Sequence, residues 1–184
     1  MQNNATTNIY ALQVKTKGEE KFIRQARALR PDYGQGLSFP QRRLDIRKGG
    51  KVRPSRLAVF PGYVFLELSA EEDVKSCFWA FRKIEGFYRF LRSNRDIAPL
   101  QNKDLELVMH FIKLGPVAEK SKVYFNEESK IVVLYGPLAG LEGKIVKIDK
   151  RKKRAKVALD LYDDSFHIDL AFEVIEKASE RSAR

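Results

Sequence analysis

The stretch Gly136-Pro137-Leu138-Ala139-Gly140-Leu141-Glu142-Gly143-Lys144 decides the fold of the C-terminal part of this chain. A phosphate-binding P-loop would need a glycine five positions before its Gly-Lys pair and a Ser or Thr after the lysine. Leu138 and Ile145 occupy those two positions, so the P-loop interpretation fails. Three glycines between short apolar runs instead predict a tight turn between two β-strands, where positive φ and close backbone approach are needed.

The segments around this turn predict a small all-β domain over residues 125–184. Short β runs span residues 130–134, 141–148, 155–161 and 165–170, and this part of the chain has no helical periodicity. Val157, Leu159 and Leu161 alternate with more polar residues, which is the period of a half-buried strand. About 60 residues of short strands favour a small SH3-like barrel.

The first 114 residues predict an α+β domain with helices packed on a mostly antiparallel sheet. Extended segments are expected at residues 9–15, 37–47, 52–68 and 87–91, and Gly49-Gly50 should join the second and third as a tight hairpin. Residues 115–124 carry no periodic pattern and are predicted to be a linker, so the two domains should be free to move independently.

Three amphipathic helices are expected in this N-terminal domain. The first carries Phe22, Ile23, Ala26 and Leu29 on one face and ends before Pro31. The pattern Ser69-x-x-Glu72 is a capping box that predicts the start of the second. The third should span residues 102–114, with a buried stripe made of Leu105, Val108, Met109 and Ile112.

Composition excludes several classes of function. Cys77 is the single cysteine, and His110 and His167 lack a metal-binding spacing, so neither a metal site nor a cofactor is expected. No nucleophile and acid–base set appears, which argues against an enzyme. A bilayer span needs about 20 apolar residues, and no such run exists. The polar N-terminus carries no signal peptide, so we expect a cytoplasmic protein. We also expect a monomer.

The positive charge is concentrated in two places. The net charge is 35 − 24 = +11, which points to a polyanionic partner, usually nucleic acid, with a membrane surface or an acidic protein as alternatives. One cluster holds eight basic residues and a single acid: Lys144, Lys147, Lys150, Arg151, Lys152, Lys153, Arg154 and Lys156, with Asp149. The second runs from Arg42 to Arg56, where a solvated mobile loop and a DNA contact are equally well supported.

Several segments resemble the NusG family of bacterial transcription factors. Ile131-Val132-Val133 followed by Gly136-x3-Gly140-x2-Gly143-x-Ile145 resembles the family's KOW motif. Phe60-Pro61-Gly62-Tyr63-Val64-Phe65-Leu66 resembles the FPGYV segment of its N-terminal (NGN) domain, and Ile9-Tyr10-Ala11-Leu12 with Gly18-x-Glu20 resembles its opening strand and turn. The matches occur in order from about Ile9 to Glu176.

The resemblance implies two binding surfaces in the NGN-like domain. A hydrophobic depression would dock on the clamp helices of RNA polymerase, with Phe60, Pro61, Tyr63, Phe87, Phe90 and Leu91 as its candidates. The first turn and helix would face the non-template DNA strand through Lys15, Lys17, Lys21 and Arg24.

The string GPLAGLEGKIVKIDKRKKR is similar to the LoaP-type specialised antiterminators. This similarity implies that the eight basic residues of the first cluster bind a nascent RNA hairpin, although most lysine-rich turns only promote solubility. Housekeeping family members carry Phe-Gly-Arg where this chain has Tyr162-Asp163-Asp164, and that neighbourhood helps them bind a ribosomal protein or Rho.

Three functions follow as hypotheses. The first is a processivity and antitermination factor that binds RNA polymerase and a nascent RNA hairpin. The second is a housekeeping elongation factor whose KOW domain recruits a ribosomal protein or Rho. The third is a ribosome-associated RNA-binding protein, since KOW barrels also occur in ribosomes.

Overall fold

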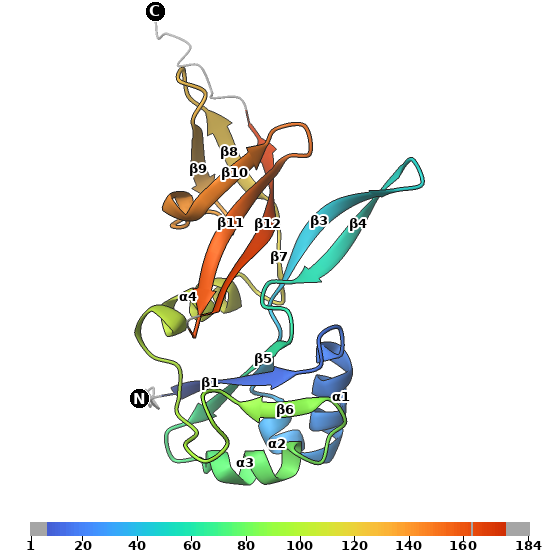
Figure 1. Cartoon of the computed structure of the whole chain (residues 1–184), viewed down its shortest axis with the longest axis vertical. Helices are drawn as coiled ribbons and strands as arrows, with labels where there is room; N and C mark the ends of the chain where they lie inside the picture. The colour runs from blue at the N-terminus through green and yellow to red at the C-terminus, as the bar shows by residue number, and fades with distance from the viewer. Residues whose placement is uncertain (1–6, 163, 176–184) are drawn as a thin grey trace, which may run out of the picture. The chain divides into compact units, whose positions relative to one another are not determined.

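The computed structural model describes residues 7–162 and 164–175, which divide into two compact units (Figure 1). The first unit comprises the described residues up to Gln41 together with Ala58–Pro116. The second comprises Arg42–Leu57 together with the described residues from Val117 onward. The first is an α+β unit and the second is β-rich, as the sequence predicted. None of the described helices is long and apolar enough to cross a membrane.

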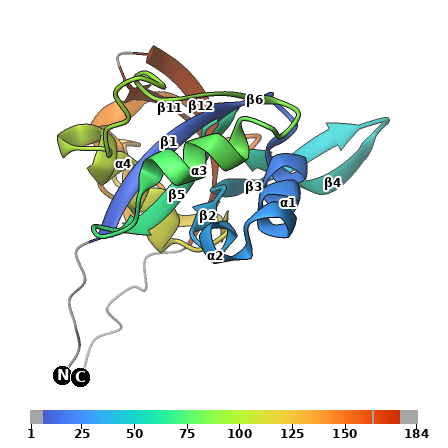
Figure 2. The same ribbon diagram turned by 90° about the horizontal axis from the view of Figure 1, so that it is seen from below.

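The first unit is built on an antiparallel four-stranded sheet. Its strand order is β2 (Leu37–Ser38), β5 (Tyr63–Ser69), β1 (Thr7–Val14) and β6 (Phe87–Phe90). Helices α1 (Glu19–Leu29) and α3 (Val74–Phe81) cover one face, as Figure 2 shows, and α2 (Pro31–Gly34) follows α1 directly. The rings of Phe22 in α1 and Phe81 in α3 pack edge to face, with their centres 5.8 Å apart, and contact Leu12 of β1 in the core. Leu29, expected on the same face as Phe22, is 47% exposed at the end of α1.

Helix α4 (Asn102–Lys113) packs against the opposite face of the sheet. Phe65 alternates with neighbours that point to the α1–α3 side, so its own ring points the other way. Phe60 packs edge to face on Phe65 at 5.2 Å and on Phe111 of α4 at 5.6 Å. The predicted buried stripe of this helix was therefore wrong except for Val108: the helix buries Leu107, Val108 and Phe111. The large ring of Phe111 decides which of two overlapping apolar stripes faces inward.

The start of α3 also differs from the prediction. One of the two hydrogen bonds of the predicted Ser69–Glu72 capping box is made, from the Ser69 N–H to the Glu72 carboxylate at 2.6 Å. It closes a turn that precedes the helix. The N-cap is Asp73, whose carboxylate accepts from the Lys75 N–H at 2.9 Å. These hydrogen bonds to Lys75 and Ser76 hold the pKa of Asp73 below its usual value.

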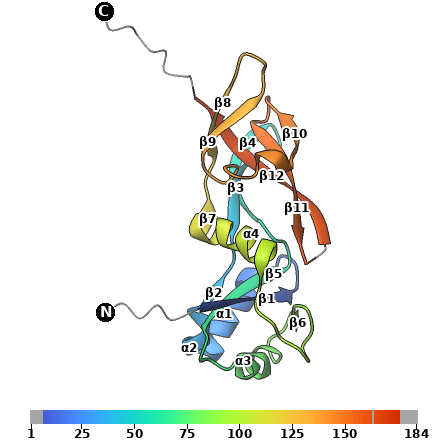
Figure 3. The same cartoon turned by 90° about the vertical axis from the view of Figure 1, so that its left-hand side faces the viewer.

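The second unit contains a five-stranded sheet, seen from the side in Figure 3. Its strand order is β10 (Ile145–Asp149), β11 (Arg154–Leu161), β12 (Asp164–Val174), β8 (Ser121–Phe125) and β9 (Ile131–Tyr135), and only the β12–β8 pair is parallel. Val157, Leu159 and Leu161 are buried, which confirms the alternation read from the sequence.

The glycine-rich stretch forms the predicted turn between β9 and β10, with the short helix η1 (Glu142–Lys144) at its end. Gly136 has a φ of +104°, and a Cβ there would lie 2.7 Å from the Cα of Ser121. The buried Ser121 hydroxyl accepts a hydrogen bond from the Leu138 N–H at 2.9 Å, which ties the turn to β8. Only glycine fits a position with this φ and this approach.

The hairpin of β3 (Gln41–Lys48) and β4 (Lys51–Ala58) turns at Gly49-Gly50, as expected, with φ values of +57° and +76°. The sequence placed this hairpin with residues 1–114, but Arg42–Leu57 belongs to the second unit. Its β3 strand pairs with β7 (Val117–Ala118) in a sheet ordered β4-β3-β7. Residues 115–124, predicted to be a linker, contain β7 and most of β8, because short strands without alternation leave little trace in a sequence. The expected domain limits 1–114, 115–124 and 125–184 stay a prediction.

Candidate nucleic-acid interface

The β10–β11 turn displays four consecutive cations at residues 150–153. The Asp149 carboxylate accepts from the Lys152 N–H at 2.8 Å, and this hydrogen bond is the main reason that the pKa of Asp149 is lowered. Lys153 adopts a left-handed φ of +52°, which closes the turn. Lys150, Arg151, Lys152 and Lys153 are therefore exposed on a tight, internally bonded turn.

The flanking strands extend this charge, as the sequence indicated. Lys147 and Lys156 are directly opposite in the β10–β11 ladder and both are exposed, as is Lys144. Like charges in this position destabilise a sheet, and Asp169, opposite Lys156 on β12, offsets part of that cost. A hollow of about 130 Å³ opens between Lys147, Asp149, Lys152, Arg154, Lys156 and Asp169.

Two cations of the predicted set also make contacts inside the unit. The guanidinium of Arg154 is largely buried, donates a hydrogen bond to the Asp45 carbonyl and lies 3.9 Å from the Asp169 carboxylate. The Lys150 ammonium lies 4.2 Å from the centre of the Phe125 ring, in a cation–π arrangement. Arg154 therefore holds β3 in place, while the other members of the set face solvent.

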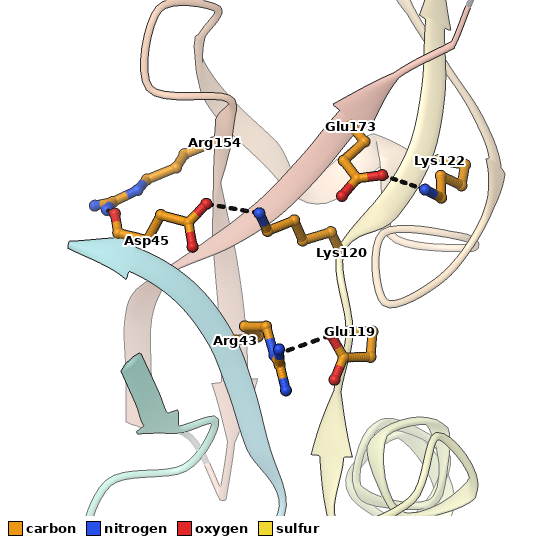
Figure 4. A network of polar contacts seen from close by, with 7 residues as sticks. All are labelled: Arg43, Asp45, Glu119, Lys120, Lys122, Arg154 and Glu173. Carbon is orange, nitrogen blue, oxygen red and sulfur yellow. Dashed lines mark hydrogen bonds and ion pairs between the residues drawn. The ribbon is translucent and has the colours of Figure 1, made fainter. Parts of the chain in front are cut away.

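A polar network fastens the β3–β4 hairpin to the five-stranded sheet, and Figure 4 shows seven of its residues. Asp45 pairs with Lys120 at 2.6 Å, and Arg43 pairs with Glu119 at 3.0 Å. Next to them, Lys122 pairs with Glu173, which raises the pKa of Lys122 and lowers that of Glu173. The network connects β3 to the segment between β7 and β8.

Arg42 is the buried charged residue of the hairpin. Its Nε donates to the Asp169 carbonyl at 2.8 Å. Burial lowers the pKa of Arg42 to about 10, so the guanidinium stays charged at neutral pH. A buried charge tolerates little displacement, so Arg42 restricts where β3 can lie.

The hairpin and the β10–β11 turn enclose a groove of about 530 Å³. Its lining comes from Asp45, Ile46, Arg47, Val52, Lys120, Arg151, Lys152, Lys153, Arg154, Ala171 and Phe172. Sequence reasoning treated the two basic clusters as separate patches and missed Lys120 altogether. The isolated acid Asp45 within the Arg42–Arg56 cluster was the available signal, because an acid in a basic strand needs a cationic partner.

The six candidates for docking on RNA polymerase do not form one surface. Phe60 is 1% exposed, Phe90 0% and Leu91 5%, whereas Pro61 is exposed and Tyr63 and Phe87 are half-buried. Phe87 and Phe90 pack on the α1–α3 side of the sheet, whereas Phe60 packs on the α4 side. Phe60, Phe90 and Leu91 are too buried to contact a partner directly. Direct contact can therefore come only from the other three candidates.

The four candidates for DNA contact lie together at the β1–α1 turn. Lys15, Lys17, Lys21 and Arg24 are all exposed, and Lys21 pairs with Glu85 at 2.7 Å. The buried Glu19 carboxylate accepts from the Gly62 N–H at 2.7 Å, which ties the turn to the loop before β5. This hydrogen bond restricts the backbone conformation of the β1–α1 turn, near which the four cations lie.

The described residues contain no group of His, Cys, Asp and Glu that could hold a metal ion. Cys77 is buried, and its burial raises the pKa of the thiol to about 12. A protonated, inaccessible thiol is a poor nucleophile. Of the Tyr162-Asp163-Asp164 departure noted in the sequence, Asp163 lies outside the described residues.

The family described as "Transcription termination factor nusG" matches residues 8–109, more than half of the chain. The chain belongs to the NusG family. The transcription termination/antitermination protein NusG of Neisseria meningitidis is 27% identical over 160 residues, covering 86% of each chain. NusG of Borreliella burgdorferi is 25% identical over 178 residues, covering 91% of this chain and 97% of its own. A solved structure described as "Domain interaction in Thermotoga maritima NusG" covers 90% of this chain and 94% of its own, at 18% identity and a TM-score of 0.47. NusG-family members are transcription factors, and nothing in these matches indicates a catalytic activity.

Proposed function

We propose that this NusG-family protein is a transcription elongation and antitermination factor that binds RNA polymerase through its first unit and nascent structured RNA through its second. RNA-bound protein would stay at the polymerase that made the transcript, because tethering raises its local concentration there. The proposed polymerase contacts are the exposed Pro61 and the half-buried Tyr63 and Phe87. Lys15, Lys17, Lys21 and Arg24 are the proposed contacts to the non-template DNA strand.

The observation that supports RNA binding is the exposed cationic face of the β10–β11 ladder. Seven of its members face solvent: Lys144, Lys147, Lys150, Arg151, Lys152, Lys153 and Lys156. Lys147 and Lys156 oppose each other, and the fold gains nothing from that repulsion. Such a concentration of positive charge lowers the stability of the fold, so we attribute it to ligand binding. It is suited to a ligand with closely spaced phosphates, such as A-form RNA.

RNA binding is tested by titrating the full chain with a labelled RNA stem-loop and with an unstructured RNA of equal length across a salt series. We expect tighter binding of the stem-loop. Replacing residues 150–153 by alanine should weaken binding and lower the slope of log K against log salt by up to about 3. A control variant loses the same charge at four exposed sites of the first unit: Lys75, Lys83, Arg95 and Lys103. If both variants lose the same RNA affinity, the effect depends only on net charge, and the proposal is contradicted.

Polymerase binding needs its own readout. Tyr63→Ala should lower the affinity of the full chain for core RNA polymerase and its read-through of a terminator in single-round transcription. Its stem-loop affinity should stay unchanged, because Tyr63 lies in the first unit. Undiminished polymerase affinity in this variant and in Phe87→Ala would exclude the proposed docking surface.

A further inference from the structure

The groove between the β3–β4 hairpin and the β10–β11 turn is strongly cationic. Six cations line it: Arg47, Lys120, Arg151, Lys152, Lys153 and Arg154. The one acid is Asp45, and its carboxylate pairs with Lys120. Arg154 bonds the Asp45 carbonyl, so the cations left to meet an anion are Arg47 from the hairpin and residues 151–153 from the turn. Positive charge therefore faces the groove from both sides.

Apolar side chains line the rest of the groove. Ile46 and Val52 come from the hairpin, and Ala171 and Phe172 come from β12. Val52 is 57% exposed, so its side chain offers apolar surface beside these cations. Phosphates alone would gain nothing from such a surface. A nucleotide would use both parts, because its base is apolar on its faces and its phosphate is charged.

The size and the fixed walls of the groove narrow the choice of ligand. A volume of about 530 Å³ is in the range of small-molecule sites. A stacked, paired base in an A-form stem cannot reach into such a hollow, whereas unpaired bases of loops and bulges can be splayed out and bound. Arg42, Arg43 and Asp45 already hold β3 in place, so ordering this wall costs little on binding.

We propose that this groove binds unpaired nucleotides of an RNA hairpin, with a base against Val52 and phosphates on Arg47 and Arg151. The proposal rests on the RNA binding proposed above and adds the β3–β4 hairpin to its binding surface. The stem would lie on the exposed β10–β11 face, and the loop or bulge would enter the groove. The hairpin would thereby contribute to the selection of one RNA over another.

The test compares two RNA probes on the full chain. One is a pool of labelled stem-loops with randomised loop nucleotides, and the other is the same stem closed by a non-nucleotide linker. We expect the nucleotide loop to bind about tenfold tighter, since a base stacked on protein contributes on the order of a tenfold affinity. Val52→Glu, which places a carboxylate in the groove, should abolish this difference without weakening the binding of the linker-closed stem more than about twofold.

Arg47→Ala and Arg53→Ala form a matched pair within the same hairpin. Both remove one exposed cation, but only Arg47 lines the groove. Arg47→Ala should weaken binding of the nucleotide loop several-fold, whereas Arg53→Ala should stay within about twofold of the parent. Unchanged thermal melting of all variants would show that the fold is intact.

The outcomes separate the groove from the proposed function. Equal binding of both probes by the parent chain would overturn the groove proposal and leave stem recognition standing. Equal effects of Arg47→Ala and Arg53→Ala would also overturn it. Binding of neither probe would overturn RNA recognition itself, and the cationic groove would then have to serve an acidic protein.

Discussion

The Lys120 ammonium lies 2.6 Å from the Asp45 carboxylate, although the two residues are 75 positions apart in the chain. Asp45 is on β3, and Lys120 is in the segment between β7 and β8. Both side chains are partly exposed, so the ion pair alone contributes at most about 1 kcal/mol. The ion pair matters mainly because it positions β3: together with the contacts of Arg42 and Arg43, it fixes one wall of the groove.

Asp45→Ala should loosen the β3–β4 hairpin without unfolding the rest of the chain. Lys120 loses its partner, and repulsion among the surrounding cations is no longer offset. We expect faster amide hydrogen exchange across residues 42–57 and unchanged exchange in β1 and β5. Glu128→Ala is the matched control, since its ion pair with Lys130 is highly exposed and lies outside this network. Slow exchange of the hairpin in Asp45→Ala would show that Arg42 and Arg43 suffice to hold it.

Phe60→Ala should destabilise the first unit by about 3–5 kcal/mol, because it removes a buried ring that bridges Phe65 and Phe111. All α-helices of the described residues belong to this unit, so urea denaturation followed by the helical circular dichroism signal reports on it. Trp79, 59% exposed, is the control: Trp79→Ala loses surface contacts with Arg82 and Phe78 and should cost about 1 kcal/mol. A small effect of Phe60→Ala would contradict its place in the core.

The three glycines of the β9–β10 turn should differ when replaced by alanine. Gly136→Ala should be the most costly, because it combines a positive φ with a clash against the Ser121 backbone. Gly140→Ala should cost about 1 kcal/mol from its φ of +77° alone, and Gly143→Ala should be nearly neutral. Amide exchange in β8 and β11 measures the series. Equal costs at all three positions would contradict the turn geometry.

Cys77 should make the stability of the first unit depend on alkaline pH. The pKa of the thiol rises from 9.0 to about 12 in the folded chain, so the folded state holds its proton where the unfolded state has lost it. Its contribution to stability is full below pH 9 and is lost progressively as the pH rises towards 12. Urea midpoints of the parent and Cys77→Ala over this range should converge as the pH rises.

A second measurement checks the same thiol directly. Because Cys77 is buried and protonated at pH 8, an aromatic disulfide reagent should label it only after denaturation. Rapid labelling of the native chain would mean that α3 opens readily or that the thiol is accessible.

Local patterns predicted the elements, and long-range contacts decided where they go. The Gly49-Gly50 hairpin, the glycine turn at 136–143 and the strand of Val157, Leu159 and Leu161 depend on neighbouring residues, and each formed as expected. The docking of β3 depends on Arg42, Asp45 and Lys120 meeting partners far along the chain, which no local period reveals. Phe60, in the loop between β4 and β5, is a second example, because nothing in the local sequence indicates that α4 covers its ring.

In the candidate site, too, the sequence predicted the features that depend on neighbouring residues and not those that depend on distant ones. The exposed cations of residues 150–153 follow from a turn between two strands, and the sequence located them. The burial of Arg154 depends on the hairpin backbone at Asp45, so its structural role had no counterpart in the local charge pattern. The docking candidates were assembled by resemblance to a family, which does not state on which side of a sheet each ring lies.

The chain passes between its two units three times, at residues 41–42, 57–58 and 116–117. The β3–β4 hairpin, which belongs to the β-rich unit, is therefore encoded between the two segments that encode the α+β unit. A gene recombined at codon 116 would pair Asp45 and Arg42 from one ancestor with residues 120 and 169 from another. Related paralogues that exchange their C-terminal halves should consequently lose the match between these positions unless the hairpin is inherited along with them.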